Sequence, residues 1–384
     1  MPMEDIEQAF AEIARLPEPN PMQRKVWEYI CTNPWGTGLL LQAPTGSGKT
    51  EAVAVPALAL GDRRVFMVYP CRSLVEDQIG RFERMLAACS ARNPGRPFAL
   101  VIDTGAYTHR LLWKAGQPVA VGNPRRHLYH GDVIVTTLDK FLYRFFGFGE
   151  PVKSYIYPLR IHYGARRSFV CFDEAHAYED VAFSNFGRLV RALYEKGIDV
   201  VVMTATMPSE FAAELGYLDV LNYATDPVHC AQLIAFAQTR YPSRRYPSKV
   251  LSLVPAAVEP SRDSAISPTI QRVLELAREE AAPDRRLIVT VERVTDAVAL
   301  YRGLQGSVQA EVLLYHGRLT AEQRRAVYRR LASIESARGG YLLVTTSAIE
   351  VGCDLDAHVL ITQVCDPDSL IQRAGRCKIG RAHV

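Results

Sequence analysis

The stretch that decides the fold is Gly38-Leu-Leu-Leu-Gln-Ala-Pro-Thr-Gly-Ser-Gly-Lys-Thr50. It begins with an apolar run of strand length, passes through a glycine-rich turn and leads into an apolar helical stretch. Small residues let the backbone N–H groups of Gly46, Gly48 and Lys49 curl round a phosphate at the start of a helix, where the helix dipole also favours anions. The stretch therefore predicts a phosphate-binding loop, with Ala43 in place of the usual first glycine.

Two side chains of this loop have expected roles of their own. Lys49 would reach the β- and γ-phosphates of a nucleotide, and the Thr50 hydroxyl would ligate Mg²⁺. A chance glycine-rich turn is the competing interpretation, but the strand before the loop and the helix after it make that interpretation weak. The predicted ATP-binding residues of the loop are Ala43, Pro44, Thr45, Gly46, Ser47, Gly48, Lys49 and Thr50.

A second apolar run, Phe169–Phe172, ends in Asp173-Glu-Ala-His176. In an open parallel sheet the ligand crevice lies beyond the carboxyl ends of the strands, so Asp173 is expected on the same edge as the phosphate loop. A carboxylate there can hold Mg²⁺, usually through water, which makes Thr50 and Asp173 the predicted metal residues. Glu174 can orient and deprotonate a water for in-line attack on the γ-phosphate.

The rest of the chain predicts an α/β fold with parallel sheets, built twice. Continuous apolar runs, rather than alternating ones, indicate strands buried on both faces. Helical patterns lie between the runs, as in Val181–Lys196, which stops at Gly197. The expected strands are Leu39–Leu41, Val65–Tyr69, Phe98–Ile102, Val133–Val135, Phe169–Phe172 and Val200–Met203, followed by Leu287–Val291, Val312–Tyr315, Tyr341–Val344 and Val359–Thr362.

The domain boundaries follow from this pattern. The stretch Asn222–Asp263 is rich in proline; its latter half is expected to link two domains, and its first part to be either irregular or an extra pair of strands. The apolar spacing in Glu4–Leu16 predicts a helix that Pro17 ends. The expected segments are an N-terminal helix (1–19), a first domain (20–222), a linker (223–265), a second domain (266–377) and a tail (378–384).

Composition limits the classes of protein to consider. The 384 residues are 48% hydrophobic with a net charge of +4, as in a globular protein with an ample core. Apolar runs are strand-sized and Met1–Phe10 lacks a signal-sequence pattern, so we expect a cytoplasmic protein with no membrane partner. The eight cysteines contain no C-x-x-C pair, which favours reduced thiols over disulfides or a zinc site.

Together these motifs resemble a superfamily 2 helicase of the DEAH type, over about residues 23–376. The resemblance implies two tandem RecA-like domains that bind ATP and Mg²⁺. It gives Gln23 the role of the adenine-reading glutamine. Within Tyr69-Pro-Cys-Arg-Ser-Leu74 and Val135-Thr-Thr-Leu-Asp-Lys140 it implies nucleic-acid contacts at Arg72, Ser73, Thr136 and Thr137. It implies coupling of hydrolysis to strand handling at His176, Thr204, Thr206 and Gln372.

The second half carries further family motifs. In Thr345–Asp356 the resemblance implies that Gly352 and Asp354 face the nucleotide, and Thr345 and Thr346 are expected to touch nucleic acid. In Ser369–Arg376 it implies two catalytic arginines, Arg373 and Arg376, about one helical turn apart. The complete predicted catalytic set is Lys49, Asp173, Glu174, Arg373 and Arg376.

Within that superfamily the chain is most similar to the CRISPR-associated helicase of type I interference systems. The supporting runs include Asp173–Tyr178, Thr206–Pro208, Ile349–Gly352 and Asp368–Arg373. The resemblance implies an ATP-driven translocase that moves 3′ to 5′ on single-stranded DNA after recruitment by a CRISPR effector complex. That family often carries a nuclease domain with a His-Asp pair, and no His-Asp dipeptide occurs here. Any nuclease is therefore expected to be a separate polypeptide, or missing.

The tail departs from the family pattern. Ile379 stands where a third arginine is expected, and residues 378–384 read like a non-native tail to be left out of fold reasoning. The missing arginine favours one alternative, a nucleotide-gated nucleic-acid-binding module with weak turnover. Another helicase of the superfamily, acting on RNA or in DNA repair, is the alternative among enzymes. A small-molecule kinase does not explain the second sheet and its arginines.

Overall fold

The protein is described by a computed structural model in which the chain forms two compact units, residues 1–240 and 241–384. Each unit has its own sheet, and each is described here by itself. The structure describes residues 5–33, 37–105, 108–121, 131–145, 167–175, 180–207, 209–240, 251–254, 267–349, 355–365, 367–375 and 381–383.

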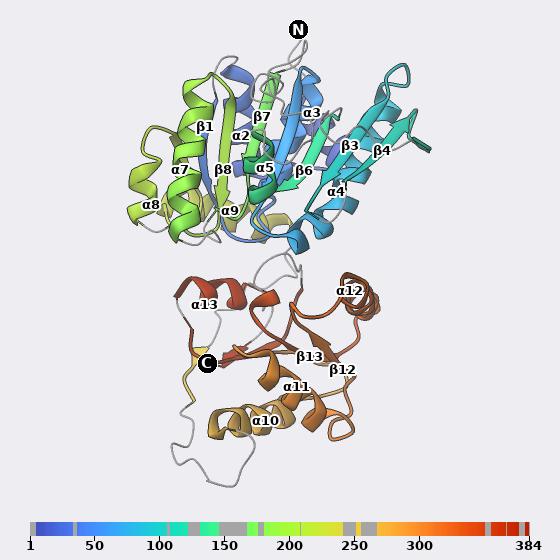
Figure 1. Ribbon diagram of the computed structural model, residues 1–384, viewed down its shortest axis with the longest axis vertical. Coiled ribbons are helices and arrows are strands. Elements are labelled where there is room, and N and C mark those ends of the chain that lie inside the picture. Colours follow the sequence, from blue (N-terminus) through green and yellow to red (C-terminus); the bar gives the residue numbers. More distant parts are fainter. Residues whose placement is uncertain are drawn as a thin grey trace. The chain divides into compact units, whose positions relative to one another are not determined.

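The first unit is built on a nine-stranded sheet in the order β5-β4-β3-β6-β2-β7-β8-β1-β9 (Figure 1). Seven of its strands pair in parallel, while β4 and β5 form an antiparallel extension at one edge. The strands are β1 (Gly38–Gln42), β2 (Arg63–Tyr69), β3 (Phe98–Asp103), β4 (Thr108–Lys114), β5 (Gln117–Val119), β6 (Val133–Thr137), β7 (Arg167–Phe172), β8 (Asp199–Thr204) and β9 (Asp219–Asn222).

Helices cover both faces of this sheet (Figure 1). One face carries α2 (Pro21–Thr32), α3 (Lys49–Leu60) and α4 (Arg72–Arg92), with the N-terminal turns of α1 (Ile6–Ala9) and the π-helix η1 (Phe10–Ala14) packed beside them. The other face carries α5 (Leu138–Phe145) and α7 (Asp180–Glu195). The remaining helices of the unit are α8 (Ser209–Glu214) and α9 (Pro227–Arg240).

Burial on both faces explains why the strands read as continuous apolar runs. Every residue of β3, β6 and β8 is buried. On the α5/α7 side Phe172 packs edge-on against Phe186, with ring centroids 5.0 Å apart, and against Phe141 at 5.9 Å. Such aromatic pairs add to the stabilisation from buried area. They also hold the end of β7 in place, and with it the residues that follow this strand.

The second unit has a six-stranded, fully parallel sheet in the order β10-β15-β14-β11-β13-β12. Its inward residues divide between a core under α10 and α11 and a second core under α12. The elements are β10 (Leu251–Ser252), α10 (Pro268–Glu280), β11 (Arg286–Thr290), α11 (Val294–Leu304), β12 (Val312–Tyr315), α12 (Ala321–Ser336), β13 (Tyr341–Thr345), the 3₁₀ turn η3 (Ser347–Ile349), β14 (Val359–Thr362), α13 (Pro367–Ala374) and β15 (Arg381–His383).

The structure confirms the α/β class, the parallel sheets and all ten expected strands. The helix expected over Val181–Lys196 is α7, and Gly197 follows it with φ of +70°. The N-terminal helix is also present, with a π-helical second half. Among the described residues, no helix combines the length and the hydropathy that a bilayer crossing requires.

Three elements differ from expectation. Residues 227–240 of the segment expected to be irregular or extended form helix α9, because Asp226 accepts N–H bonds from Val228 and His229 and Pro227 takes the first helical position. The hairpin β4–β5 was not expected, since its strands are short and half-exposed. Residues 381–383, expected to lie outside the fold, pair with β14 and β10, because an edge strand offers free backbone groups to any extended segment.

A buried ion pair holds the end of β3 in the first unit. Arg144 Nε of α5 lies 2.9 Å from Asp103 Oδ2, and the two side chains are 2% and 0% exposed. The other carboxylate oxygen of Asp103 accepts a bond from Thr108 Oγ1 at 2.8 Å. Removing one member of such a pair leaves a buried charge without compensation, which costs far more than losing a surface ion pair.

We therefore expect Arg144→Met to lower the free energy of unfolding of the first unit by about 3–5 kcal/mol, measured by urea unfolding. Arg24→Met, which removes an exposed ion pair with Glu7, is the matched control and should cost less than about 1 kcal/mol. Equal losses in the two variants would contradict a structural role for the buried pair.

Candidate functional site

Three neighbouring strands deliver the predicted catalytic groups to one edge of the first sheet. The strands β7, β8 and β1 lie side by side and are parallel, so their carboxyl ends meet at that edge. The phosphate loop follows β1, Asp173 follows β7, and Thr204 ends β8. Because adjacent strands are about 4.8 Å apart, the loop and the carboxylate come within reach of one triphosphate.

The loop has the backbone conformation that its glycines predict. Gly46 and Gly48 have φ values of +77° and +84°, in the left-handed region that favours glycine. A Cβ on Gly48 would lie 2.5 Å from Gln23 Nε2, so a larger residue there would also displace the Gln23 side chain. At the start of the loop, Ala43 N donates to Thr204 O at 3.0 Å. That bond ties the loop to the strand that carries a predicted coupling residue.

Lys49 is the first residue of α3 and its side chain is folded back onto the loop. It is 6% exposed, and its Nζ donates to the carbonyl oxygens of Ala43 at 3.0 Å and Pro44 at 3.4 Å. A phosphate oxygen is a stronger, charged acceptor than these neutral carbonyls. A bound phosphate can therefore replace one of these carbonyl oxygens as the acceptor for the Lys49 ammonium group.

Gln23 connects α2 to the phosphate loop. Its backbone N–H and side-chain Oε1 form a reciprocal cap with Asn20, each at 2.9 Å, and its Nε2 donates to Gly48 O at 3.3 Å. Asn20 Nδ2 donates to Ser47 O at 2.9 Å. The Gln23 amide keeps one lone pair and one hydrogen beyond these bonds, a donor–acceptor pair such as an adenine edge requires. Its role in reading adenine stays a prediction.

In the acidic pair, Asp173 is buried and Glu174 is partly buried with an unusual backbone conformation. Asp173 N donates to Val68 O at 2.9 Å, and Asp173 Oδ1 accepts from Glu174 N at 2.9 Å. Glu174 itself has φ of +52°, unusual for a residue other than glycine. Burial, together with the neighbouring charge of Glu174, raises the pKa of Asp173 to about 7, against the opposing influence of Lys49. A cation bound beside Asp173 would favour the ionised form of this carboxyl.

The donor set fits a magnesium ion shared with a nucleotide. Thr50 and Asp173, both 6% exposed, offer a hydroxyl and a carboxylate, the oxygen ligands that Mg²⁺ prefers. Among the described residues, no group of three or more His, Cys, Asp and Glu side chains could cage a metal. The site would therefore hold Mg²⁺ through few protein oxygens, with water and phosphate as the remaining ligands.

The predicted nucleic-acid residues of the first unit differ in exposure: Arg72 is exposed, whereas Thr136 and Thr137 are buried. Arg72 is exposed, and its guanidinium lies so close to Gly105 that a Cβ there would be 2.6 Å from Nη2. The side chains of Thr136 and Thr137 are 0% and 2% exposed, and the Thr136 hydroxyl donates to Asp103 O at 2.7 Å. These two side chains are thus buried in this structure, and their contact with nucleic acid stays a prediction. The side chain of Ser73 lies outside the description.

In the coupling motif, the Thr204 hydroxyl donates to Thr206 O, which closes the turn after β8. The Thr206 hydroxyl is buried and has no hydrogen-bond partner among the described residues. A hydroxyl in that position can accept or donate a bond when a ligand changes the turn. The proposed coupling partner His176 lies outside the described residues.

In the second unit, the described motif residues lie inside the fold. Thr345 is 0% exposed and bonds to Thr346 O at 3.2 Å, Thr346 is 5% exposed, and Gln372 is 4% exposed. Arg373 is 1% exposed and pairs with Glu292 of the same unit at 2.7 Å. Both side chains are engaged internally here, and the contacts of Thr345 with nucleic acid and of Arg373 with a nucleotide stay predictions. Gly352, Asp354 and Arg376 lie outside the described residues.

Sequence reasoning missed several residues that shape the site. Asp103 is the last residue of β3 and Gly105 lies two positions after it, so attention to strand ends could have found them. Arg81 of α4 lies 3.4 Å from the carboxylate of Glu51, near the start of α3. This ion pair joins α4, which begins at Arg72, to α3, which follows the phosphate loop. No local sequence pattern predicts the Arg81–Glu51 pair, since its members are 30 positions apart.

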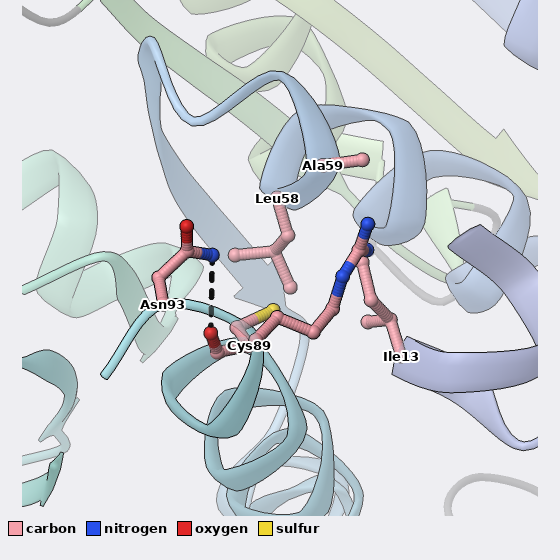
Figure 2. Close-up of a pocket in the computed structure, with 6 residues that line it drawn as sticks. Ile13, Leu58, Ala59, Cys89 and Asn93 are labelled. Atoms are coloured by element: carbon pink, nitrogen blue, oxygen red, sulfur yellow. Dashed lines mark hydrogen bonds between the residues drawn. The ribbon is translucent and has the colours of Figure 1, made fainter. Parts of the chain in front are cut away.

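A separate pocket of about 170 Å³ lies at the other end of α3 and α4 (Figure 2). Asn93 Nδ2 closes one side of it by donating to Cys89 O at 3.3 Å. Because the pocket uses the last turn of α3 while the phosphate loop precedes the first, about 13 Å of helix separates the two. Its lining residues are Ile13, Leu58, Ala59, Cys89, Arg92 and Asn93.

Comparison with known proteins agrees with this geometry. Residues 20–215, about half of the chain, match the DEAD/DEAH box helicase family. The chain belongs to that family. The match covers the phosphate loop and the Asp173–Glu174 pair, and the assignment of the ATP site to that loop stays a prediction. Residues 284–381 match the C-terminal part of the CRISPR-associated nuclease/helicase Cas3.

Three similar proteins illustrate the match. The CRISPR-associated endonuclease/helicase Cas3 of Escherichia coli K12 is 27% identical over 369 residues, which is 88% of this chain and 40% of that protein. The crystal structure of T. fusca Cas3 with AMPPNP covers 98% of this chain and 47% of its own, with a TM-score of 0.67 and 19% identity. The DUF1998 helicase MrfA bound to DNA covers 100% and 50%, with a TM-score of 0.68 and 18% identity. The chain thus spans half or less of the length of these three proteins.

The acidic pair generates a stability prediction. A carboxyl whose folded pKa is raised to about 7 favours the folded state while it is protonated, and that contribution is lost as pH rises from about 4 through 7. At pH 8 without divalent cations, Asp173→Asn should therefore raise the melting temperature, by roughly 2–8 °C. Asp103→Asn, which breaks the buried pair with Arg144, should lower it under the same conditions. A lower melting temperature for both variants would contradict the proposed electrostatic cost at Asp173.

Proposed function

We propose that this chain is the ATP-driven motor of a CRISPR-associated helicase and moves along single-stranded DNA. The observation that carries the proposal is the meeting of the phosphate loop and the Asp173–Glu174 pair at one sheet edge. That edge belongs to a chain whose second half matches the Cas3 C-terminal family. Both findings together favour a DNA-directed CRISPR helicase over a general phosphate-binding enzyme.

Each group at the edge has a defined task in hydrolysis. Lys49 binds the β- and γ-phosphates, and backbone N–H groups of the loop bind the remaining phosphate oxygens. Glu174 accepts a proton from the attacking water and orients it in line with the γ-phosphate. Bound Mg²⁺, held by Thr50 and Asp173, supplies neutralising charge to the phosphate oxygens. Since Asp173 gains little neutralisation from the protein itself, its charge is available for that ion.

The second unit completes the proposed site. We assign the guanidinium that stabilises transition-state charge on the γ-phosphate to Arg376, with Gly352 and Asp354 as further nucleotide contacts. An arginine from another unit makes hydrolysis depend on the arrangement of the two units. Coupling to the nucleic acid is assigned to the turn at Thr204 and Thr206, supported by the bond from the phosphate loop to Thr204.

The family match supports binding of nucleic acid, and the finer details are proposals. We propose single-stranded DNA as the track, 3′ to 5′ movement, recruitment by a CRISPR effector complex, a separate nuclease and a cytoplasmic location. Arg72 and Ser73 begin helix α4 at the sheet edge and are the proposed contacts to the DNA backbone. Because phosphates dominate such contacts, binding should weaken steeply with salt.

The hydrolytic roles can be separated by two substitutions. Lys49→Ala should abolish binding or turnover of ATP, because the phosphate contacts are lost. Glu174→Gln should leave ATP binding intact and lower the rate of hydrolysis by roughly 10²–10⁴-fold, the usual contribution of a general base. Steady-state ATPase assays and equilibrium nucleotide binding give the two readouts. A Glu174→Gln protein that hydrolyses ATP at the parent rate would exclude Glu174 as the base.

The choice of nucleic acid is tested by stimulation of the ATPase. Single-stranded DNA should raise the rate, and an RNA of the same sequence should raise it less. Stimulation by RNA alone would end the CRISPR proposal and favour an RNA helicase of the same superfamily. The variant Arg72→Ala should weaken stimulation by DNA without changing the KM for ATP measured in its absence.

A further inference from the structure

A buried side chain of the helix that carries the arginine motif contacts the ends of two strands. Arg373 lies near the end of α13 and is 1% exposed. Its Nη2 donates to Glu292 Oε1 at 2.7 Å, and its Nη1 donates to Thr362 Oγ1 at 2.8 Å. Both acceptors stand at the carboxyl ends of strands, Glu292 just after β11 and Thr362 at the end of β14.

These contacts belong to a larger network at that edge. Thr362 Oγ1 donates its own proton to Gln363 O at 3.0 Å, which leaves its lone pairs to accept from Arg373. Gln363 Oε1 accepts from Glu292 N at 2.8 Å, and Gln363 N donates to Thr290 O at 3.2 Å. Two strand ends and one helix are therefore joined by a connected set of bonds, which reaches α13 through Arg373.

We propose that Glu292 and Thr362 are positioning residues, which act through Arg373 to hold α13 against the ends of β11 and β14. In this assignment Arg373 orients the helix and does not itself contact the nucleotide. The inference deepens the proposed function, because the helix it orients leads directly to the arginine assigned to the γ-phosphate. It reassigns Arg373 from a catalytic to a positioning role.

The burial of Arg373 and Thr362 favours this role over the main alternative. In the rival account Glu292 is a latch that releases Arg373 to a bound triphosphate. Release would break two hydrogen bonds from a guanidinium, one of them to a carboxylate, and would leave the hydroxyl of Thr362, a residue only 3% exposed, without that donor. Charge-assisted bonds of this kind are about twice as strong as neutral ones, so a fixed anchor is the favoured arrangement.

The test is hydrogen exchange of the full chain without nucleotide. Arg373→Ala and Glu292→Ala should each speed exchange of the α13 amides, residues 368–374, at least tenfold, and the double variant should add little. Glu292→Gln keeps an oxygen acceptor and should retain part of the protection. Amides of β11 and β13 report whether the unit stays folded. Should Arg373→Ala unfold it, the Glu292 and Thr362→Val variants still give the result.

The second unit also offers a matched control. Arg330 and Glu311 form an exposed ion pair at 2.6 Å, far from α13 in the sequence. Arg330→Ala should leave exchange of α13 unchanged. Unchanged exchange in Glu292→Ala, or an equal change in Arg330→Ala, would overturn the proposal.

Binding of ADP with beryllium fluoride separates the anchor from the latch. The anchor predicts that Glu292→Ala and Arg373→Ala weaken binding of this γ-phosphate mimic by similar factors. Tighter binding by Glu292→Ala together with loss in Arg373→Ala would establish the latch instead and overturn the anchor. Since the exchange measurement uses no nucleotide, it tests the anchor even if the chain proves to have no DNA-stimulated ATPase.

Discussion

The site in the first unit depends on one backbone hydrogen bond, from Ala43 N to Thr204 O at 3.0 Å. It fixes the start of the phosphate loop to the end of β8, and β8 lies between the strand that carries the loop and the strand that carries Asp173. The parallel pairing of all three strands then sets the distance between the phosphate loop and the Asp173 carboxylate. A change in register on either side of β8 would turn alternate side chains to the opposite face and separate these groups.

The same arrangement lowers the stability of the folded state at this site. The Asp173 carboxylate is desolvated beside Glu174, and Glu174 has a backbone conformation that side-chain-bearing residues rarely adopt. Such strain persists where the surrounding structure over-determines it, and here the surroundings are a fully buried strand and aromatic packing behind it. A ligand that brings positive charge offsets the electrostatic cost at Asp173. The site is therefore stabilised by the ligands that it binds.

Sequence alone predicted the features that depend on local pattern. Runs such as Phe169–Phe172 read as strands because a strand buried on both faces needs apolar residues throughout. The loop glycines were predictable because φ above zero is a local requirement. Helix α9 was missed although Asp226 and Pro227 form a recognisable start, because the prolines nearby were taken as breakers rather than as first helical residues.

Other features could not be read from local pattern. The burial of Thr136 depends on Asp103, 33 positions away, and the anchoring of Arg373 depends on Glu292, 81 positions away. Whether a polar residue at a strand end faces solvent or the interior is decided by neighbouring strands and helices, which a motif does not record. For this reason the motifs indicate the strand ends at which the candidate residues stand, while the roles of individual threonines and of Arg373 also depend on the structure around them.

The measurement that tests the account most directly is a crystal structure of the protein with AMPPNP and Mn²⁺, with the metal located by its anomalous scattering. The account predicts the metal beside Thr50 and Asp173, and the γ-phosphate within hydrogen-bonding distance of Lys49. A triphosphate bound elsewhere, or a metal peak away from Asp173, would contradict the central claim that this sheet edge is the site of ATP hydrolysis.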